Sequence, residues 1–137
     1  MYCGFTNEIE KYFSSADIFV FPTLYEPFGL VILEAMASGL PVVTSKLAGA
    51  AELIENGKDG LLLDDPKNPK EIAEKVNYLI ENERIRRAMG RNARKKAEKH
   101  PWERTAKEML EVFEKITKKQ RCDNHMYGMK NEKKRIL

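Results

Sequence analysis

Residues 26–39 read EPFGLVILEAMASG, and they lie between FVFPT at residues 19–23 and PVVTS at residues 41–45. The two flanking stretches are short runs of β-branched and aromatic residues, which is typical of buried strands. The apolar and small residues between them predict a helix that begins near Phe28 or Gly29. The Gly-Leu-Pro that follows ends the helix, because a glycine and then a proline cannot continue it. The stretch therefore predicts a strand, a helix and a second strand in succession.

The start of this helix has the properties of a binding site for an anion. The first amides of a helix have no partner within the helix, and the aligned peptide dipoles place about +0.5 of a charge there. A phosphate fits such a helix end. At Gly29 no Cβ obstructs the approach of a ligand to the backbone.

Two acidic residues flank the predicted anion site. Glu26 lies in the loop before the helix, and Glu34 lies about 8 Å along the helix axis from its start. Ionised carboxylates only accept hydrogen bonds, so the ligand must also offer hydroxyl donors. A nucleotide-diphosphate sugar meets both conditions, with its diphosphate at the helix start and one set of hydroxyls on each acid.

Glu26 and Glu34 are separated by seven residues, and the EPFGL context resembles the E-x7-E motif of retaining GT-B glycosyltransferases of family 4. The similarity covers roughly residues 4–117 and is carried by several other stretches: ADIFVFPT, EAMASGLPVVTS, GAAELIENGKDGLLL and WERTAKEMLEVFE. The motif is specific because it combines the spacing with the Phe-Gly pair, the small-residue run and the strand that follows.

The resemblance implies transfer of a hexose from a nucleotide-diphosphate sugar with retention of configuration. It assigns Glu26, the expected catalytic residue, to the hydroxyls of the donor sugar. The backbone amides of Phe28, Gly29 and Leu30 would meet sugar hydroxyls and the distal phosphate, and Glu34 would bind the ribose. Neither a metal nor another cofactor is expected, and Asp64-Asp65 is interpreted as a turn that leads into a helix.

The remaining pattern predicts an α/β fold in which a parallel, Rossmann-like sheet carries helices on both faces, followed by a C-terminal helix. Strands are expected at residues 17–21, 41–45 and 60–63, and helices at residues 7–15, 51–55, from 69, 82–99 and from 101. Ligands of such sheets bind beyond the carboxyl ends of the strands, so the loops at Glu26 and at residues 46–49 should meet at one edge.

Three strands are too few for a complete domain of this kind. The resemblance implies that residues 1–119 are part of the nucleotide-sugar-binding domain of a GT-B enzyme. Residues 120–137 are polar and non-periodic, which predicts a basic, flexible tail. The acceptor-binding N-terminal domain would be missing. We therefore expect the chain to supply the donor-binding half and to be inactive alone.

Charge is unevenly distributed along the 137 residues. Residues 1–83 contain 6 Lys and Arg against 14 Asp and Glu, whereas residues 84–137 contain 18 against 7, so the net charges are −8 and +11. An alternative function is a non-catalytic basic module that binds RNA or an anionic membrane surface through residues 84–135, but a solvated helix surface followed by a tail is the preferred interpretation of this charge. For the enzyme, the same face would be a membrane contact, and nucleic acid is not the expected partner. A nucleotide-sugar epimerase with the same fold is the other alternative.

Cys3 and Cys122 lie near opposite ends of the chain and lack metal-ligand spacing. Free thiols indicate a cytoplasmic location, peripheral at the inner face of the membrane if the basic segment contacts lipid.

Overall fold

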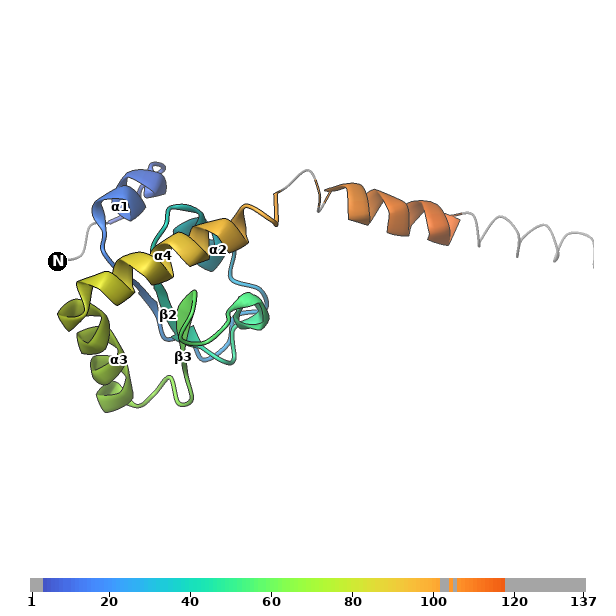
Figure 1. Ribbon diagram of the computed structural model, residues 1–137. Coiled ribbons are helices and arrows are strands. Elements are labelled where there is room, and N and C mark those ends of the chain that lie inside the picture. The colour runs from blue at the N-terminus through green and yellow to red at the C-terminus, as the bar shows by residue number, and fades with distance from the viewer. Residues whose placement is uncertain (1–3, 102–103, 105, 118–137) are drawn as a thin grey trace, which may run out of the picture. The chain divides into compact units, whose positions relative to one another are not determined.

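The computed structural model describes residues 4–101, 104 and 106–117 (Figure 1). Cys3, Cys122 and the predicted tail at residues 120–137 lie outside this part. The chain divides into two compact units, Met1–Lys99 and His100–Leu137. The predicted domain boundary at residue 119 stays a prediction.

The first unit alternates helices and strands in the expected order. Its elements are α1 (Ile9–Ser15), β1 (Phe19–Phe21), α2 (Leu30–Ala37), β2 (Val42–Ser45), the 3₁₀ helix η1 (Gly49–Leu53), β3 (Gly60–Leu63), α3 (Pro69–Glu81) and α4 (Glu83–Ala97). Asn68 caps α3, and its side chain accepts hydrogen bonds from the amides of Lys70 and Glu71. Pro69 occupies the first helical position, where its missing N–H costs nothing.

The three strands form one parallel sheet in the order β1-β2-β3. In the register of this sheet, Val43 lies opposite Val20 on β1 and opposite Leu61 on β3. The expected parallel α/β fold is confirmed. Its elements are shorter than predicted at several ends: β1 begins at Phe19 rather than at residue 17, and α2 begins at Leu30. The brief helix expected at residues 51–55 is the 3₁₀ helix η1.

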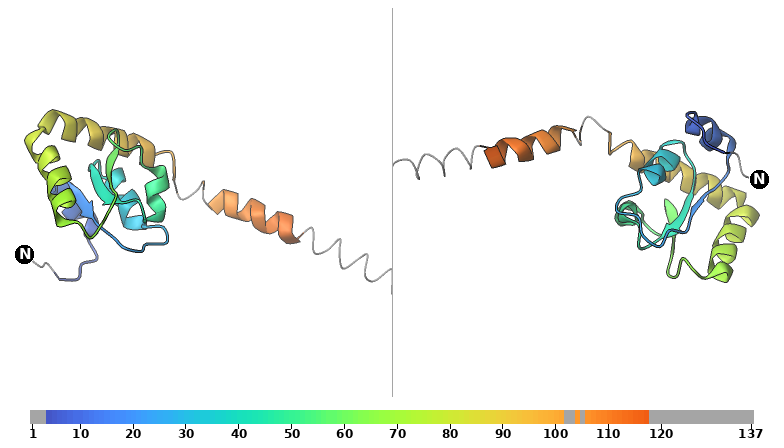
Figure 2. Two further views of the ribbon diagram at one scale, coloured as in Figure 1. Left: turned by 90° about the horizontal axis from the view of Figure 1, so that it is seen from below. Right: turned by 180° about the vertical axis from the view of Figure 1, so that it is seen from behind.

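Both faces of the sheet are covered, because side chains alternate between the faces along each strand. One face packs Val42, Phe19 and Leu62 against α2 and η1, and the other packs Val43, Leu61 and Leu63 against α3. Figure 2 shows α2 and α3 on opposite sides of the sheet. Each large side chain that is buried in this way stabilises the fold by about 1.5–3 kcal/mol.

Helix α4 closes one side of both cores. Its Met89 joins the core under α3, whereas its Ala93 and Ala97 join the core under α2. In the sequence, Ile85, Ala88, Met89 and Ala93 recur along one side of this helix, which predicts that Ala88 is buried with them. Ala88 is only half-buried, and Gly90 is buried in its place.

In the second unit, residues 104 and 106–117 are helical, as predicted. Within the described residues, no helix is both long and apolar enough to cross a membrane.

Candidate functional site

The loops after β1 and β2 meet at the carboxyl edge of the sheet, as the topology predicted. Glu26 forms an isolated parallel bridge with Ala48. The amide of Gly49 donates to the carbonyl of Glu26 at 3.0 Å, and the amide of Ala50 donates to the carbonyl of Phe28 at 2.6 Å. These bonds fix the loop that carries Glu26 against the start of η1.

Gly49 permits this contact because it has no side chain. A Cβ on Gly49 would lie 2.1 Å from the carbonyl oxygen of Pro27 and 3.0 Å from the Cα of Phe28. Both atoms belong to the backbone and cannot rotate away. The topology predicted that the loop at residues 46–49 lies near Glu26, but nothing in the sequence indicated that Gly49 is the point where the two backbones touch.

Gly29 precedes α2 in a left-handed conformation, with φ of 86° and ψ of 61°. This conformation favours glycine, because a Cβ there would clash with the backbone. No side chain caps the helix. Within the described residues, the amides of Phe28, Gly29 and Leu30 donate no hydrogen bond. Three backbone donors therefore remain available at the positive end of α2.

Glu26 lies directly beside Gly29. It is half-buried, and its Cγ lies 3.1 Å from the point that a Cβ on Gly29 would occupy. The side chain of Glu26 thus covers the turn at Gly29. No ion pair involves its carboxylate in the part of the chain that the structure describes.

Glu34 lies in the second turn of α2 and is exposed. Ile32, Ala35 and Met36 occupy the buried side of the helix. Because residues four apart share a helix face, Glu34 lies on the side of Leu30, about 6 Å further along the axis. The structure therefore groups Glu26 with the three amides and places Glu34 one turn beyond them.

Charged residues in the loops after β2 and β3 form a network of contacts at the same edge of the sheet. Lys46, which follows β2, pairs with Asp64, which follows β3. Glu71 on α3 accepts the amides of Asp64 at 2.9 Å and Asp65 at 3.0 Å. These two bonds lower the pKa of Glu71 to about 2. The sequence predicted the turn at Asp64-Asp65, but it did not predict its partners, Lys46 after β2 and Glu71 on α3.

Within the described residues, no group of three or more His, Cys, Asp or Glu side chains is placed to hold a metal ion. The expectation that no metal is needed stays a prediction.

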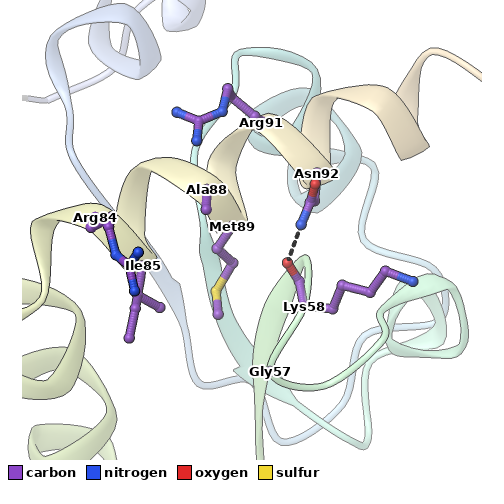
Figure 3. A pocket seen from close by; sticks show the side chains of 8 residues that line it. All are labelled: Gly57, Lys58, Arg84, Ile85, Ala88, Met89, Arg91 and Asn92. Carbon is purple, nitrogen blue, oxygen red and sulfur yellow. Dashed lines mark hydrogen bonds between the residues drawn. The ribbon is translucent and has the colours of Figure 1, made fainter.

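An open hollow lies at the opposite edge of the sheet, where the loop before β3 faces α4 (Figure 3). Gly57 and Lys58 line it from the loop. The side chain of Asn92 on α4 donates to the carbonyl of Lys58 at 3.0 Å, which holds the loop to the helix. Because Gly57 precedes β3 and Glu26 follows β1, this hollow is separate from the Glu26 edge.

The fold and the site at the carboxyl edge define a Rossmann-like α/β domain of the kind found in GT-B enzymes, and the relatives of the chain identify its family. Residues 1–96 match the family of glycosyl transferases group 1. The chain belongs to this family.

Three similar proteins illustrate the match. Spore coat protein SA of Bacillus subtilis is 39% identical over 111 residues, which are 80% of this chain and 29% of that protein. An uncharacterised glycosyltransferase of Methanocaldococcus jannaschii is 40% identical over 116 residues, which are 82% of this chain and 30% of that protein. The crystal structure of Anabaena HepE in complex with UDP-glucose superposes with a TM-score of 0.66 at 37% identity, over 70% of this chain and 26% of that one. The chain spans less than a third of the length of these relatives.

Proposed function

We propose that this chain forms the donor-binding part of a retaining glycosyltransferase that transfers a hexose from a nucleotide-diphosphate sugar. The observation that carries the proposal is the position of Glu26 over Gly29, beside the three amides of residues 28–30 that have no acceptor. This arrangement offers a carboxylate to sugar hydroxyls and positive donors to a phosphate at the same place. The UDP-glucose bound to Anabaena HepE supports a ligand of this class.

The chemistry follows from where charge develops. As the bond between the anomeric carbon and the phosphate oxygen breaks, negative charge builds up on the departing diphosphate. Backbone amides that are already oriented toward that position stabilise the transition state without reorganising. In this proposal the amides of Phe28, Gly29 and Leu30 perform this role, and Glu26 holds the sugar in place while the bond breaks.

Glu34 has a different task in the proposal. It lies one turn beyond the amides, on the face of α2 that carries Leu30, and its exposed carboxylate is available to accept hydrogen bonds from the ribose hydroxyls. In this proposal Glu26 therefore binds the donor sugar, and Glu34 binds the ribose of the nucleoside. A separate acceptor-binding domain and a cytoplasmic location are further parts of the proposal.

This division of roles can be tested with nucleotide alone and with the complete donor. Affinity for UDP and for UDP-glucose is measured by titration calorimetry for the wild-type chain and for Glu34→Gln, Glu26→Gln and Glu52→Gln. Glu52 is an exposed acid in the first turn of η1, and it serves as a matched control with the same change of charge.

A hydrogen bond to a charged group contributes about 1.5–3 kcal/mol. We therefore expect Glu34→Gln to lower the affinity for UDP and for UDP-glucose roughly 10- to 150-fold. Glu26→Gln should leave the affinity for UDP unchanged, and it should remove the additional affinity that the glucose of UDP-glucose provides. Glu52→Gln should alter neither. Equal losses in all three variants would show a general effect of charge, and unchanged binding in Glu34→Gln would refute the assigned role of Glu34.

A further inference from the structure

The orientation of α4 is fixed by its buried side. A Cβ on Gly90 would lie 2.1 Å from the carbonyl oxygen of Gly39, so the helix backbone lies directly against the turn between α2 and β2. Met89, Ala93 and Ala97 are buried on the same side. Because neither the helix nor the turn can move closer or rotate, the residues on the opposite side of α4 are held toward solvent.

That outer side is densely cationic. Its exposed basic residues are Arg84, Arg87, Arg91, Arg94 and Lys95. Arg87 pairs with Glu83 at 2.6 Å and Arg94 pairs with Glu98 at 3.1 Å. Arg84, Arg91 and Lys95 make no ion pair within the described residues. We refer to these three residues as the cation stripe.

The cation stripe runs along the helix axis. Its members are spaced at i, i+7 and i+11, which places them on one line along the helix. At about 1.5 Å per residue, the charges are spread over roughly 16 Å. The hollow of Figure 3 borders this line, because Arg84 and Arg91 both belong to its lining together with Lys58 and Asn92. No acidic residue of the described chain lines the hollow, so an anion can approach both arginines there.

The charge around the cation stripe favours a membrane rather than a nucleic acid as its binding partner. Residues 84–99 contain eight Lys and Arg against one Glu, a net charge of +7, whereas residues 1–83 carry −8. A flexible polyanion long enough to pass beyond α4 would meet the acidic part of the unit, whereas a flat anionic surface contacts one side only. Neither α4 nor the hollow contains an aromatic side chain on which bases could stack.

We propose that the outer side of α4 is a docking surface for an anionic membrane, in which Arg84, Arg91 and Lys95 contact lipid phosphates and carboxylates. Binding is electrostatic, since the exposed part of α4 offers no large apolar side chain for insertion into the bilayer. The contact orients the unit on the membrane through one side and leaves the Glu26 edge of the sheet free to take its ligand. The proposal does not depend on which nucleotide sugar the chain binds.

The test is co-sedimentation of the 137-residue chain with vesicles. Phosphatidylcholine vesicles with about 30% phosphatidylserine are compared with pure phosphatidylcholine at about 0.1 M salt, where charges near the surface still interact with it. The stripe variant is Arg84→Gln/Arg91→Gln/Lys95→Gln. The matched control is Lys46→Gln/Lys67→Gln/Lys70→Gln, which removes three exposed positive charges of the same unit outside α4. Residues 118–137 carry seven Lys and Arg in every protein compared, so their contribution cancels.

Each Lys or Arg near an anionic surface strengthens partitioning roughly fivefold, so the stripe variant should partition on the order of 100-fold more weakly than the wild type. The control should stay within about threefold, and pure phosphatidylcholine should bind none of the proteins. The proposal is overturned if both triple variants partition to anionic vesicles equally weakly. It is also overturned if the wild type binds neutral and anionic vesicles equally, or if it binds neither. It is also overturned if a single-stranded oligonucleotide binds through the stripe at physiological salt while anionic vesicles do not.

Discussion

Gly49→Ala probes the contact that brings the two site loops together. The added methyl group would lie 2.1 Å from the carbonyl oxygen of Pro27. Carbon and oxygen atoms that are not bonded approach to about 3.3 Å at the closest, so the two backbones must separate by roughly 1.2 Å. Gly49 does not have a positive φ, so the substitution adds no dihedral strain and its effect reports the close approach alone.

The expected cost has two sources. Overpacking against a rigid neighbour costs about 1–3 kcal/mol. The separation also lengthens the bonds from Gly49 to Glu26 and from Ala50 to Phe28, which are 3.0 and 2.6 Å long, and each contributes about 1 kcal/mol. We therefore expect Gly49→Ala to lower the free energy of unfolding by about 2–4 kcal/mol, as measured by urea denaturation monitored by circular dichroism.

Gly57→Ala is the matched control for this experiment. Gly57 has a φ of 84° with no atom within 4 Å of the added Cβ, so its replacement costs only the left-handed strain of about 1–2 kcal/mol. Gly49→Ala should also lose UDP binding, whereas Gly57→Ala should keep it. If Gly49→Ala were as stable as the wild type and bound UDP normally, the loop contact would not hold the site together.

Three further substitutions test individual contacts, each by denaturation of the purified chain. Gly90→Ala should destabilise the chain by about 1–3 kcal/mol although alanine favours helices, because the methyl group meets the Gly39 carbonyl; a gain in stability would contradict the packing of α4. Asn68→Ala removes the cap of α3 and should cost about 0.5–2 kcal/mol, whereas Asn77→Ala on the exposed side of the same helix should cost nothing measurable. Glu71 has a pKa of about 2 in the folded chain against about 4.3 when unfolded, so its stabilising effect is complete above about pH 4.5 and is lost as the pH falls toward 2. The Tm of the wild type should therefore fall more steeply than that of Glu71→Gln across this range, and parallel curves would exclude the two amide bonds to Asp64 and Asp65.

The sequence predicted the parallel sheet because its strands are short apolar runs whose ends are marked by Pro, Gly and Asp. It also predicted α3 well, since Asn68 and Pro69 are specific signals for a helix start. It placed Glu26 beside the start of α2, although it began that helix one or two residues too early. Gly29 adopts a left-handed conformation and acts as the N-cap, which residue pattern alone did not distinguish from a first helical residue.

The contacts that the sequence could not reveal join residues distant in the chain. A side chain at Gly49 would clash with the backbone of Pro27, and one at Gly90 would clash with the backbone of Gly39. In the sequence, a glycine that permits such a close contact cannot be told from a glycine that forms a turn. The pairing of Asp59 with Lys96 is another such contact. Asp59 is buried and pairs with a residue on α4, whereas the Asp59-Gly60 dipeptide by itself indicates only a turn.

The most direct test of the donor-site account is the amide chemical-shift map of the ¹⁵N-labelled chain as UDP, GDP or ADP is added. We expect at least one of these nucleotides to produce saturable shifts centred on the amides of Phe28, Gly29 and Leu30, and we expect Glu34→Gln to weaken its binding. If those three amides stay unmoved while the largest shifts fall on Gly57, Lys58 and α4, the nucleotide binds elsewhere and the proposed site is wrong.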